Sequence, residues 1–154
     1  MKRIVFAASL ALAAAVPAFS VEPHAHDGQP PVHELTLDHG SKWATDAPLR
    51  EGMSRIRAAL AGKHAAMSNG TLGDAGYAEL GDTIEKNVAS IVANCKLSPE
   101  ADANLHVVVA ELANAADAMR SATPMSRIEG AQKAVNAVNL YGRYFDHPGW
   151  KPIA

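Results

Sequence analysis

Apolar residues recur at helical spacing in four successive segments between residues 45 and 147, and this feature constrains the fold most strongly. Within each segment the intervals are three and four residues, which is typical of a helix that buries one face. No segment shows sustained strand-like alternation. The four apolar stripes are Leu49, Met53, Ile56, Leu60, His64 and Met67; Tyr77, Leu80, Ile84, Val88, Ile91 and Cys95; Ala101, Leu105, Val108, Leu112, Ala115 and Met119; and Ile128, Ala131, Val135, Val138, Tyr141 and Phe145.

Capping and turn signals separate these segments. Three of them begin with a capping side chain followed within two residues by a first-turn proline, whose missing N–H costs nothing there. The second begins near Asp74, after the turn signal Asn69-Gly70. Short connections of this kind predict an all-α chain whose residues 45–147 form an antiparallel up-down-up-down four-helix bundle, with a C-terminal tail over 148–154. The three capped starts are Asp46 with Pro48, Ser98 with Pro99, and Thr123 with Pro124.

The first twenty residues have the layout of a secretory signal peptide. Two basic residues precede an uninterrupted apolar run over 4–16, and the small residues Ala18 and Ser20 flank a cleavage position. The run is shorter than the roughly 20 apolar residues needed to cross a bilayer. We therefore expect residues 1–20 to be removed on export to the periplasm, with no membrane insertion of the mature chain.

The charge of the mature chain argues against nucleic acid and anionic lipid as partners. Removing Lys2 and Arg3 from the 14 basic residues leaves 12 against 16 acidic residues, a net charge of −4. The single cysteine, Cys95, cannot form an internal disulfide. The sequence contains no nucleophile elbow, phosphate-binding glycine loop or His-Glu-x-x-His motif, so we do not expect an enzyme.

Residues 21–44 read as an extended tail rich in proline and histidine. Leu35 and Leu37 alternate with polar neighbours, which predicts a short strand-like stretch against the core. Histidines in such a tail bind Cu(II), Ni(II) or Zn(II) loosely, and they are equally typical of a solvated, pH-sensitive linker. The four tail histidines are His24, His26, His33 and His39.

The antiparallel arrangement places one group of candidate metal ligands at the end of the bundle where the first helix begins. At about 1.5 Å of rise per residue, Met53 and His106 lie at nearly the same height, with Cys95 at the rim and His147 and His39 close by. Thiolate, thioether and imidazole suit Cu(I), or zinc if the methionine takes no part. The alternative is a core methionine and an inert buried thiol.

A second candidate group lies at the opposite end. His64 and Met67 are three residues apart and share a helix face, and Met119 and Met125 flank the third turn. This thioether-rich group also suits Cu(I), although methionine is a common filler of core gaps.

The predicted architecture resembles the periplasmic four-helix-bundle cytochromes over about residues 46–147. In the soluble b-type members, a methionine early in the first helix and a histidine near the end of the fourth hold the haem. Met53 and His147 match these positions, so the resemblance implies non-covalent haem b. The c-prime type attaches haem through Cys-x-x-Cys-His in the fourth helix, where this chain has Leu140-Tyr141-Gly142-Arg143-Tyr144, which excludes covalent haem.

The chain is also similar to small proteobacterial exported proteins catalogued as DnrO-like, notably over Trp43–Met53 and Asn94–His106. That resemblance implies little established chemistry and points to Cys95 and His106 as the residues to test.

The leading hypothesis is a periplasmic four-helix-bundle protein that binds a transition metal, copper, for buffering or delivery to a periplasmic partner. Two alternatives stay open. One is a b-type haem protein. The other is a ligand-free interaction module that docks through the aromatic residues at the end of the bundle near Cys95, which are Trp43, Tyr141, Tyr144, Phe145 and Trp150.

Overall fold

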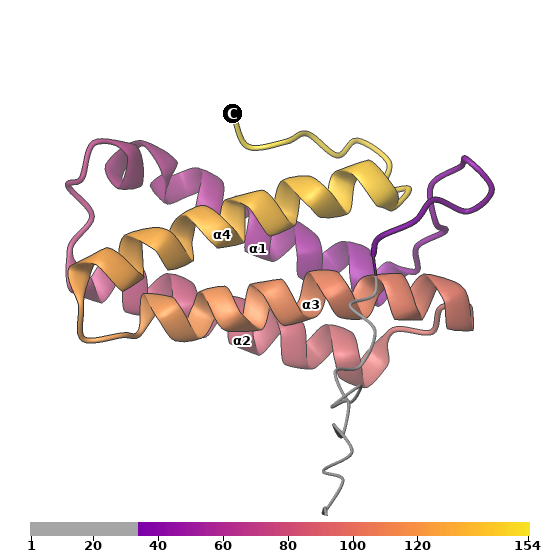
Figure 1. The fold of residues 1–154 in the computed structure, drawn as a ribbon, viewed down its shortest axis with the longest axis horizontal. Helices are drawn as coiled ribbons and strands as arrows, with labels where there is room; N and C mark the ends of the chain where they lie inside the picture. The colour runs from indigo at the N-terminus through magenta and orange to yellow at the C-terminus, as the bar shows by residue number, and fades with distance from the viewer. Residues whose placement is uncertain (1–33) are drawn as a thin grey trace, which may run out of the picture. The chain divides into compact units, whose positions relative to one another are not determined.

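The computed structural model describes residues 34–154, so the predictions for the signal peptide and for His24, His26 and His33 lie outside the described residues. This part of the chain contains four α-helices and no strand, which confirms the all-α prediction (Figure 1). None of the four combines the length and apolarity needed to cross a bilayer. The helices are α1 (Ala47–Ser68), α2 (Asp74–Asn94), α3 (Pro99–Met119) and α4 (Pro124–Tyr144).

The helices begin where the capping signals predict. Asp46, Ser98 and Thr123 each accept a hydrogen bond from the backbone N–H three residues on, at 2.9, 3.2 and 3.4 Å. Each cap is followed by a proline at the first or second helical position. A cap of this kind stabilises a helix by about 1 kcal/mol, because it satisfies an N–H that has no intrahelical partner. The second helix begins at Asp74 without a side-chain cap.

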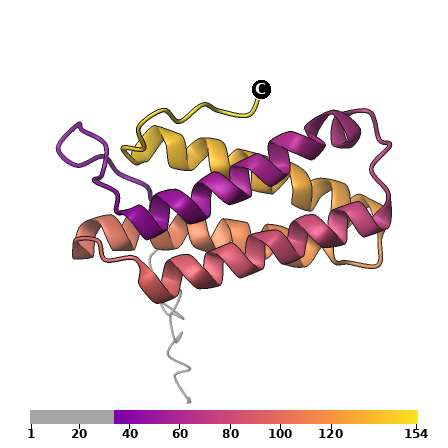
Figure 2. The ribbon, with the colours of Figure 1, turned by 180° about the vertical axis from the view of Figure 1, so that it is seen from behind.

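Each helix packs against its neighbours in sequence, and α1 also contacts α4. The α1–α2 and α3–α4 connections lie together at one end, and the α2–α3 connection lies at the other (Figures 1 and 2). Two hydrogen bonds tie the start of α1 to this second end. The Lys96 N–H donates to Asp46 Oδ2, and the Trp43 N–H donates to the Tyr144 carbonyl at 2.8 Å.

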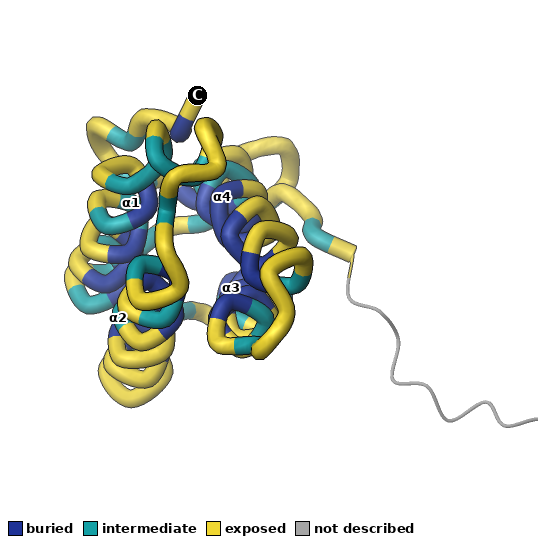
Figure 3. The backbone as a smooth tube through the Cα atoms, turned by 90° about the vertical axis from the view of Figure 1, so that its left-hand side faces the viewer, coloured by how far each residue is buried: buried dark blue, intermediate teal, exposed yellow. Residues whose placement is uncertain are grey.

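The buried faces of the four helices meet along the axis of the bundle (Figure 3). Close approach of α3 to its neighbours depends on two glycines. A Cβ added at Gly130 would lie 2.8 Å from the Ala115 carbonyl oxygen, and one at Gly81 would lie 2.9 Å from that of Ala116. Larger residues at these positions would force the backbones apart. The largest fully buried side chains are Tyr141, Phe145, Leu49, Met53, Ile56, Leu60, Leu80, Ile84, Ile91, Leu112, Met119 and Val108.

The segments flanking the helices pack on the bundle. Leu35 contacts the core, but no strand forms there, and Leu37 is 43% exposed. After α4, the chain turns back along the bundle, where Ile153 exchanges two backbone hydrogen bonds with the Asn139 side chain at 2.8 and 2.9 Å. Trp150 packs directly on the bare face of Gly142. The residues predicted as a C-terminal tail therefore cover part of the bundle.

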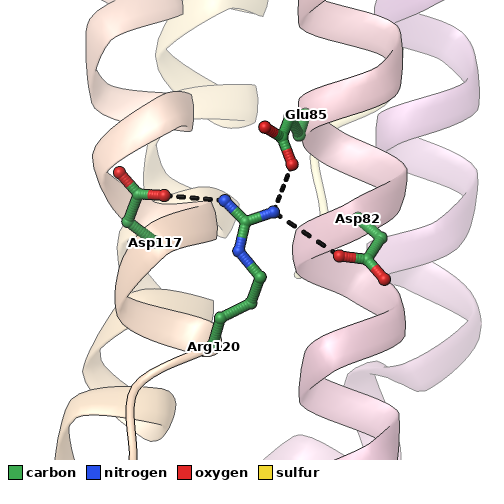
Figure 4. A network of polar contacts seen from close by, with 4 residues as sticks. All are labelled: Asp82, Glu85, Asp117 and Arg120. Atoms are coloured by element: carbon green, nitrogen blue, oxygen red, sulfur yellow. Dashed lines mark hydrogen bonds and ion pairs between the residues drawn. The ribbon is translucent and has the colours of Figure 1, made fainter.

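Charge is divided unevenly between the helices. Lys and Arg outnumber Asp and Glu by four to one in α1 and by three to one in α4. The acidic residues outnumber the basic ones by four to one in α2, and α3 has four acidic residues and no Lys or Arg. Arg120, the C-terminal cap of α3, partly neutralises the acidic residues of α2 and α3. It pairs with Asp117 at 2.7 Å, with Asp82 at 3.5 Å and with Glu85 (Figure 4).

Candidate functional site

The candidate cysteine lies at the point where α2 ends. Cys95 is the first residue beyond the helix, with φ −70° and ψ 147°, and its N–H donates to the Ile91 carbonyl at 2.8 Å. The thiol is half-buried, and Cys95 is the one cysteine of the chain. The extended backbone at this cap directs the chain toward the Ser98 start of α3, which brings the two helix ends together.

Cys95 and His106 line the same pocket between α2 and α3, which we call the α2–α3 pocket. Its volume is about 150 Å³. The structure therefore brings together two of the ligands predicted from the sequence, and it adds the Asp102 side chain, which the sequence reasoning missed. The four-residue spacing between Asp102 and His106 on one helix face was the available signal. The remaining lining residues are apolar: Ile91, Val92, Leu105 and Val109.

Asp102 holds the His106 ring. The His106 Nδ1 atom lies 2.8 Å from the Asp102 carbonyl oxygen and 3.4 Å from a carboxylate oxygen of the same residue. We assign the proton to Nδ1, because the carbonyl can only accept, and the neutral ring then carries a free lone pair on Nε2. A histidine that donates through one nitrogen to a carbonyl or carboxylate is typical of metal ligands. The His106 side chain is 68% exposed, so a bound ion can reach it from solvent.

The Cys95 thiol is held in its protonated form. Burial raises its pKa most, and the nearby carboxylates of Asp46 and Asp102 raise it further. Because the thiolate is the metal-binding form, a cation that binds here must displace the thiol proton. The same carboxylates make the surroundings attractive to a cation.

Met53 and His39 lie apart from this pocket. Met53 is fully buried in the hydrophobic core and is not among the lining residues. His39 stands in a tight turn with a φ of 48°, beside Asp38, and its side chain is 99% exposed. The structure thus leaves Cys95 and His106 as the pair at this end of the bundle.

The second predicted group is divided. His64 and Met67 line a small pocket of about 60 Å³ between α1 and α4. Met119 is fully buried in the core, and Met125 is 65% exposed. Of the four predicted side chains, only His64 and Met67 therefore line the same pocket.

His147, the histidine of the haem alternative, uses both ring nitrogens. Nδ1 lies 3.0 Å from the Tyr141 hydroxyl, and Nε2 lies 3.3 Å from Ser54 Oγ. Burial raises the pKa of Tyr141, which keeps its hydroxyl protonated as the donor to Nδ1. Burial also lowers the pKa of His147, and the charge of Arg50 lowers it further. Both effects favour the neutral ring, and we assign its proton to Nε2.

The aromatic residues gather at one end, as the sequence predicts. The rings of Tyr141 and Phe145 stack at 5.1 Å between centroids, and Trp150 meets Tyr141 edge-on at 4.9 Å. Trp43 hydrogen-bonds to the end of α4 through its backbone. Tyr141 and Phe145 are buried, whereas Trp43, Tyr144 and Trp150 are partly exposed.

Within residues 34–154, no three His, Cys, Asp or Glu side chains converge closely enough to enclose a metal ion. The chain matches no protein family model, no curated protein and no solved structure. The resemblances to four-helix-bundle cytochromes and to DnrO-like proteins accordingly stay predictions.

Proposed function

We propose that this chain is an exported, periplasmic metal-binding protein that holds Cu(I) between Cys95 Sγ and His106 Nε2 for buffering or delivery. The observation that carries the proposal is the α2–α3 pocket, which is lined by both a thiol and an oriented imidazole. Thiolate sulfur selects soft ions such as Cu(I), and imidazole is a common second donor.

The proposal includes an antiparallel up-down-up-down bundle, in which the end of α2 and the start of α3 lie at the same end of the bundle. Three contacts support it. The start of α1 bonds to the end of α2 and to the end of α4, and Arg127 near the start of α4 pairs with Asp74 at the start of α2 at 2.7 Å. An antiparallel bundle requires the start of α1 to lie with the ends of α2 and α4, and the starts of α2 and α4 to lie together, and these contacts agree with both requirements.

The donor set favours copper over zinc. Zinc sites in proteins use three or four protein ligands, whereas this pocket offers one thiol and one imidazole. Soft thiolate ligands also select Cu(I). A two-donor site on the surface leaves coordination positions open, so that a partner can take over the ion by ligand exchange. The exposed His106 ring suits such a transfer, and the acidic side chains of α2 and α3 draw cations toward the pocket.

Haem coordination by Met53 and His147 has less support. It would require Met53 to leave the hydrophobic core and His147 to give up a hydrogen bond to Tyr141 or Ser54. The interaction-module alternative has less support as well, because three of its five aromatic rings, those of Tyr141, Phe145 and Trp150, contact one another.

Competition titration of the reduced mature protein, residues 21–154, against a Cu(I) chelator tests the proposal. We expect one tight site, and we expect Cys95→Ser and His106→Gln each to weaken Cu(I) binding by at least about tenfold. His39→Gln is the matched control, because it removes an exposed imidazole from another part of the structure. Equal affinities for the wild type and both pocket variants would contradict the proposal, and a Soret band on adding haem would favour the alternative.

A further inference from the structure

A second pocket, of opposite character, lies beside α1 where the chain leaves α4. Its volume is about 410 Å³, and it shares no residue with the α2–α3 pocket. The volume falls within the range of about 300–1,000 Å³ that is typical of small-molecule sites. We call it the arginine pocket, and its lining residues are Arg50, Glu51, Ser54, Arg55, His147 and Pro148.

Two guanidinium groups supply hydrogen-bond donors to this pocket. The Arg50 side chain is held by two hydrogen bonds from Nη1, to the Thr45 carbonyl at 2.5 Å and to the Thr45 hydroxyl at 3.1 Å. Both use the same nitrogen, so Nη2 and Nε can donate to a ligand. Arg55 pairs with Glu51 at 3.1 Å on the surface, where both side chains are more than half exposed. An exposed pair of this kind is weak, so a ligand can compete for Arg55.

Ser54 and His147 supply a third, oriented donor. His147 Nδ1 lies 3.0 Å from the Tyr141 hydroxyl and Nε2 lies 3.3 Å from Ser54 Oγ, and we assign the Tyr141 hydroxyl as the donor to Nδ1 and Nε2 as the donor to Ser54. The serine oxygen accepts this bond, which leaves its own hydroxyl proton available to a ligand. Packing of the imidazole against Trp150, at 4.7 Å between centroids, fixes the ring.

The electrostatics of the pocket favour an anion. With His147 neutral, two arginines and one glutamate give a net charge of +1, on the helix that carries the largest excess of basic residues. His147 faces Arg50 on α1, Asp146 on its own segment, and the Tyr141 hydroxyl on α4. Burial lowers the pKa of His147 most, the charge of Arg50 lowers it further and that of Asp146 raises it, so Arg50 contributes a positive potential at the ring.

We propose that the arginine pocket binds a small phosphate-bearing molecule, with the phosphate oxygens held by Arg50, Arg55 and the Ser54 hydroxyl. Guanidinium groups match the geometry of phosphate oxygens, and two of them beside a hydroxyl provide more donors than a carboxylate can use. The pocket is larger than a phosphate ion, so it has room for an attached organic group. A phospholipid headgroup carries the same phosphate group, so the experiment distinguishes a soluble phosphate from a membrane surface.

Titration of the mature protein with inorganic phosphate and with glycerol phosphate tests this proposal, read out by calorimetry and by the NMR shifts of the His147 ring. We expect saturable binding that shifts the His147 signals, and weaker binding of acetate. Arg55→Gln should weaken phosphate binding by about tenfold, the loss of one charged hydrogen bond. Ser54→Ala should weaken it by about threefold, as a neutral donor is lost.

Lys133→Gln is the matched control, because it removes an equal charge from an exposed position of α4. Arg50→Gln also removes the brace to Thr45, so Arg55→Gln and Ser54→Ala, whose side chains are exposed, carry the test. No saturable binding, or equal weakening by Lys133→Gln, would overturn the proposal. Binding to phosphatidic acid vesicles without binding of soluble phosphate would also overturn it, because the ligand would then be a membrane surface.

Discussion

The α2–α3 pocket and the arginine pocket are built on the same helical scaffold, yet they present opposite chemistry. The first places a thiol, an imidazole and a carboxylate among apolar side chains, between two helices with an excess of acidic residues. The second places two guanidinium groups, a hydroxyl and an imidazole on the most basic helix. The comparison teaches that one helical scaffold can carry pockets of opposite charge, because the helices around them differ in their charged residues.

The two pockets also differ in how they are held together. Cys95 and His106 lie 11 positions apart across one helix connection, so their position in one pocket depends mainly on how α2 ends and α3 begins. Ser54 and His147 lie 93 positions apart and meet only because the chain turns back after α4. Changes to this returning segment should therefore affect one pocket and leave the other intact.

The largest expected effect comes from Trp150→Ala. Trp150 packs on Gly142, contacts the rings of Tyr141 and His147, and lies under the Arg57 guanidinium at 5.9 Å. We expect its loss to lower the free energy of unfolding by about 3 kcal/mol and to abolish phosphate binding, while Cu(I) affinity is unchanged. Urea denaturation and the two titrations measure these effects.

Met125→Ala is the control for this change. Met125 is 65% exposed, so its truncation should alter the free energy of unfolding by less than about 0.5 kcal/mol. If Trp150→Ala weakened Cu(I) binding as much as phosphate binding, the two pockets would not be independent.

The next largest effect is the dependence of Cu(I) affinity on pH. The pKa of the Cys95 thiol is raised by burial and by two carboxylates, so the free protein holds this proton throughout the neutral range. Cu(I) binding releases it, and the affinity should rise about tenfold for each unit of pH below the thiol pKa. A series of chelator competitions between pH 6 and pH 8 measures the slope. An affinity independent of pH would show that Cys95 is not the ligand.

A smaller effect is expected from Asp102→Asn. This change removes a carboxylate that raises the pKa of Cys95, while the backbone carbonyl that orients His106 remains. We expect the thiol pKa to fall and the rate of alkylation of Cys95 at neutral pH to rise about threefold. Glu111→Gln, at an exposed position of the same helix, should leave the rate unchanged. A slower reaction in Asp102→Asn would contradict the assigned electrostatics.

The smallest effect concerns His147. Its folded-state pKa lies below the ordinary value, so the unfolded chain takes up the proton first as the pH falls. The stability of the bundle should therefore decline as the pH falls through about 6.5, the unfolded value, and level off below the folded pKa. Thermal unfolding of the wild type and of His147→Gln measures this. A variant that loses stability to the same extent would show that His147 is not responsible.

The sequence predicted those features that depend on neighbouring residues. The capping side chains with their prolines set the helix starts, and the apolar stripes identified the core, because both signals are local. Cys95 and His106 were found together because a short connection joins their helices. In contrast, the rise per residue placed Met53 at the height of His106, whereas its position in the apolar stripe indicated a core residue, and Met53 lies in the core.

The arginine pocket could not be predicted in this way. The sequence marks Arg50 and Arg55 as ordinary surface charges, and nothing local indicates that His147 reaches Ser54 on α1. The same holds for Arg120, whose partners on α2 lie 35 and 38 positions away. Contacts of this range depend on the assembled bundle and on where the chain returns after its last helix.

X-ray absorption spectroscopy at the copper edge, on mature protein loaded with one equivalent of Cu(I), tests the central claim most directly. We predict one sulfur and one nitrogen donor in the wild type, loss of the sulfur in Cys95→Ser, and loss of the imidazole signal in His106→Gln. His64→Gln should leave the spectrum unchanged. A spectrum that keeps its sulfur and imidazole donors in both pocket variants would contradict the assignment of the α2–α3 pocket as the copper site.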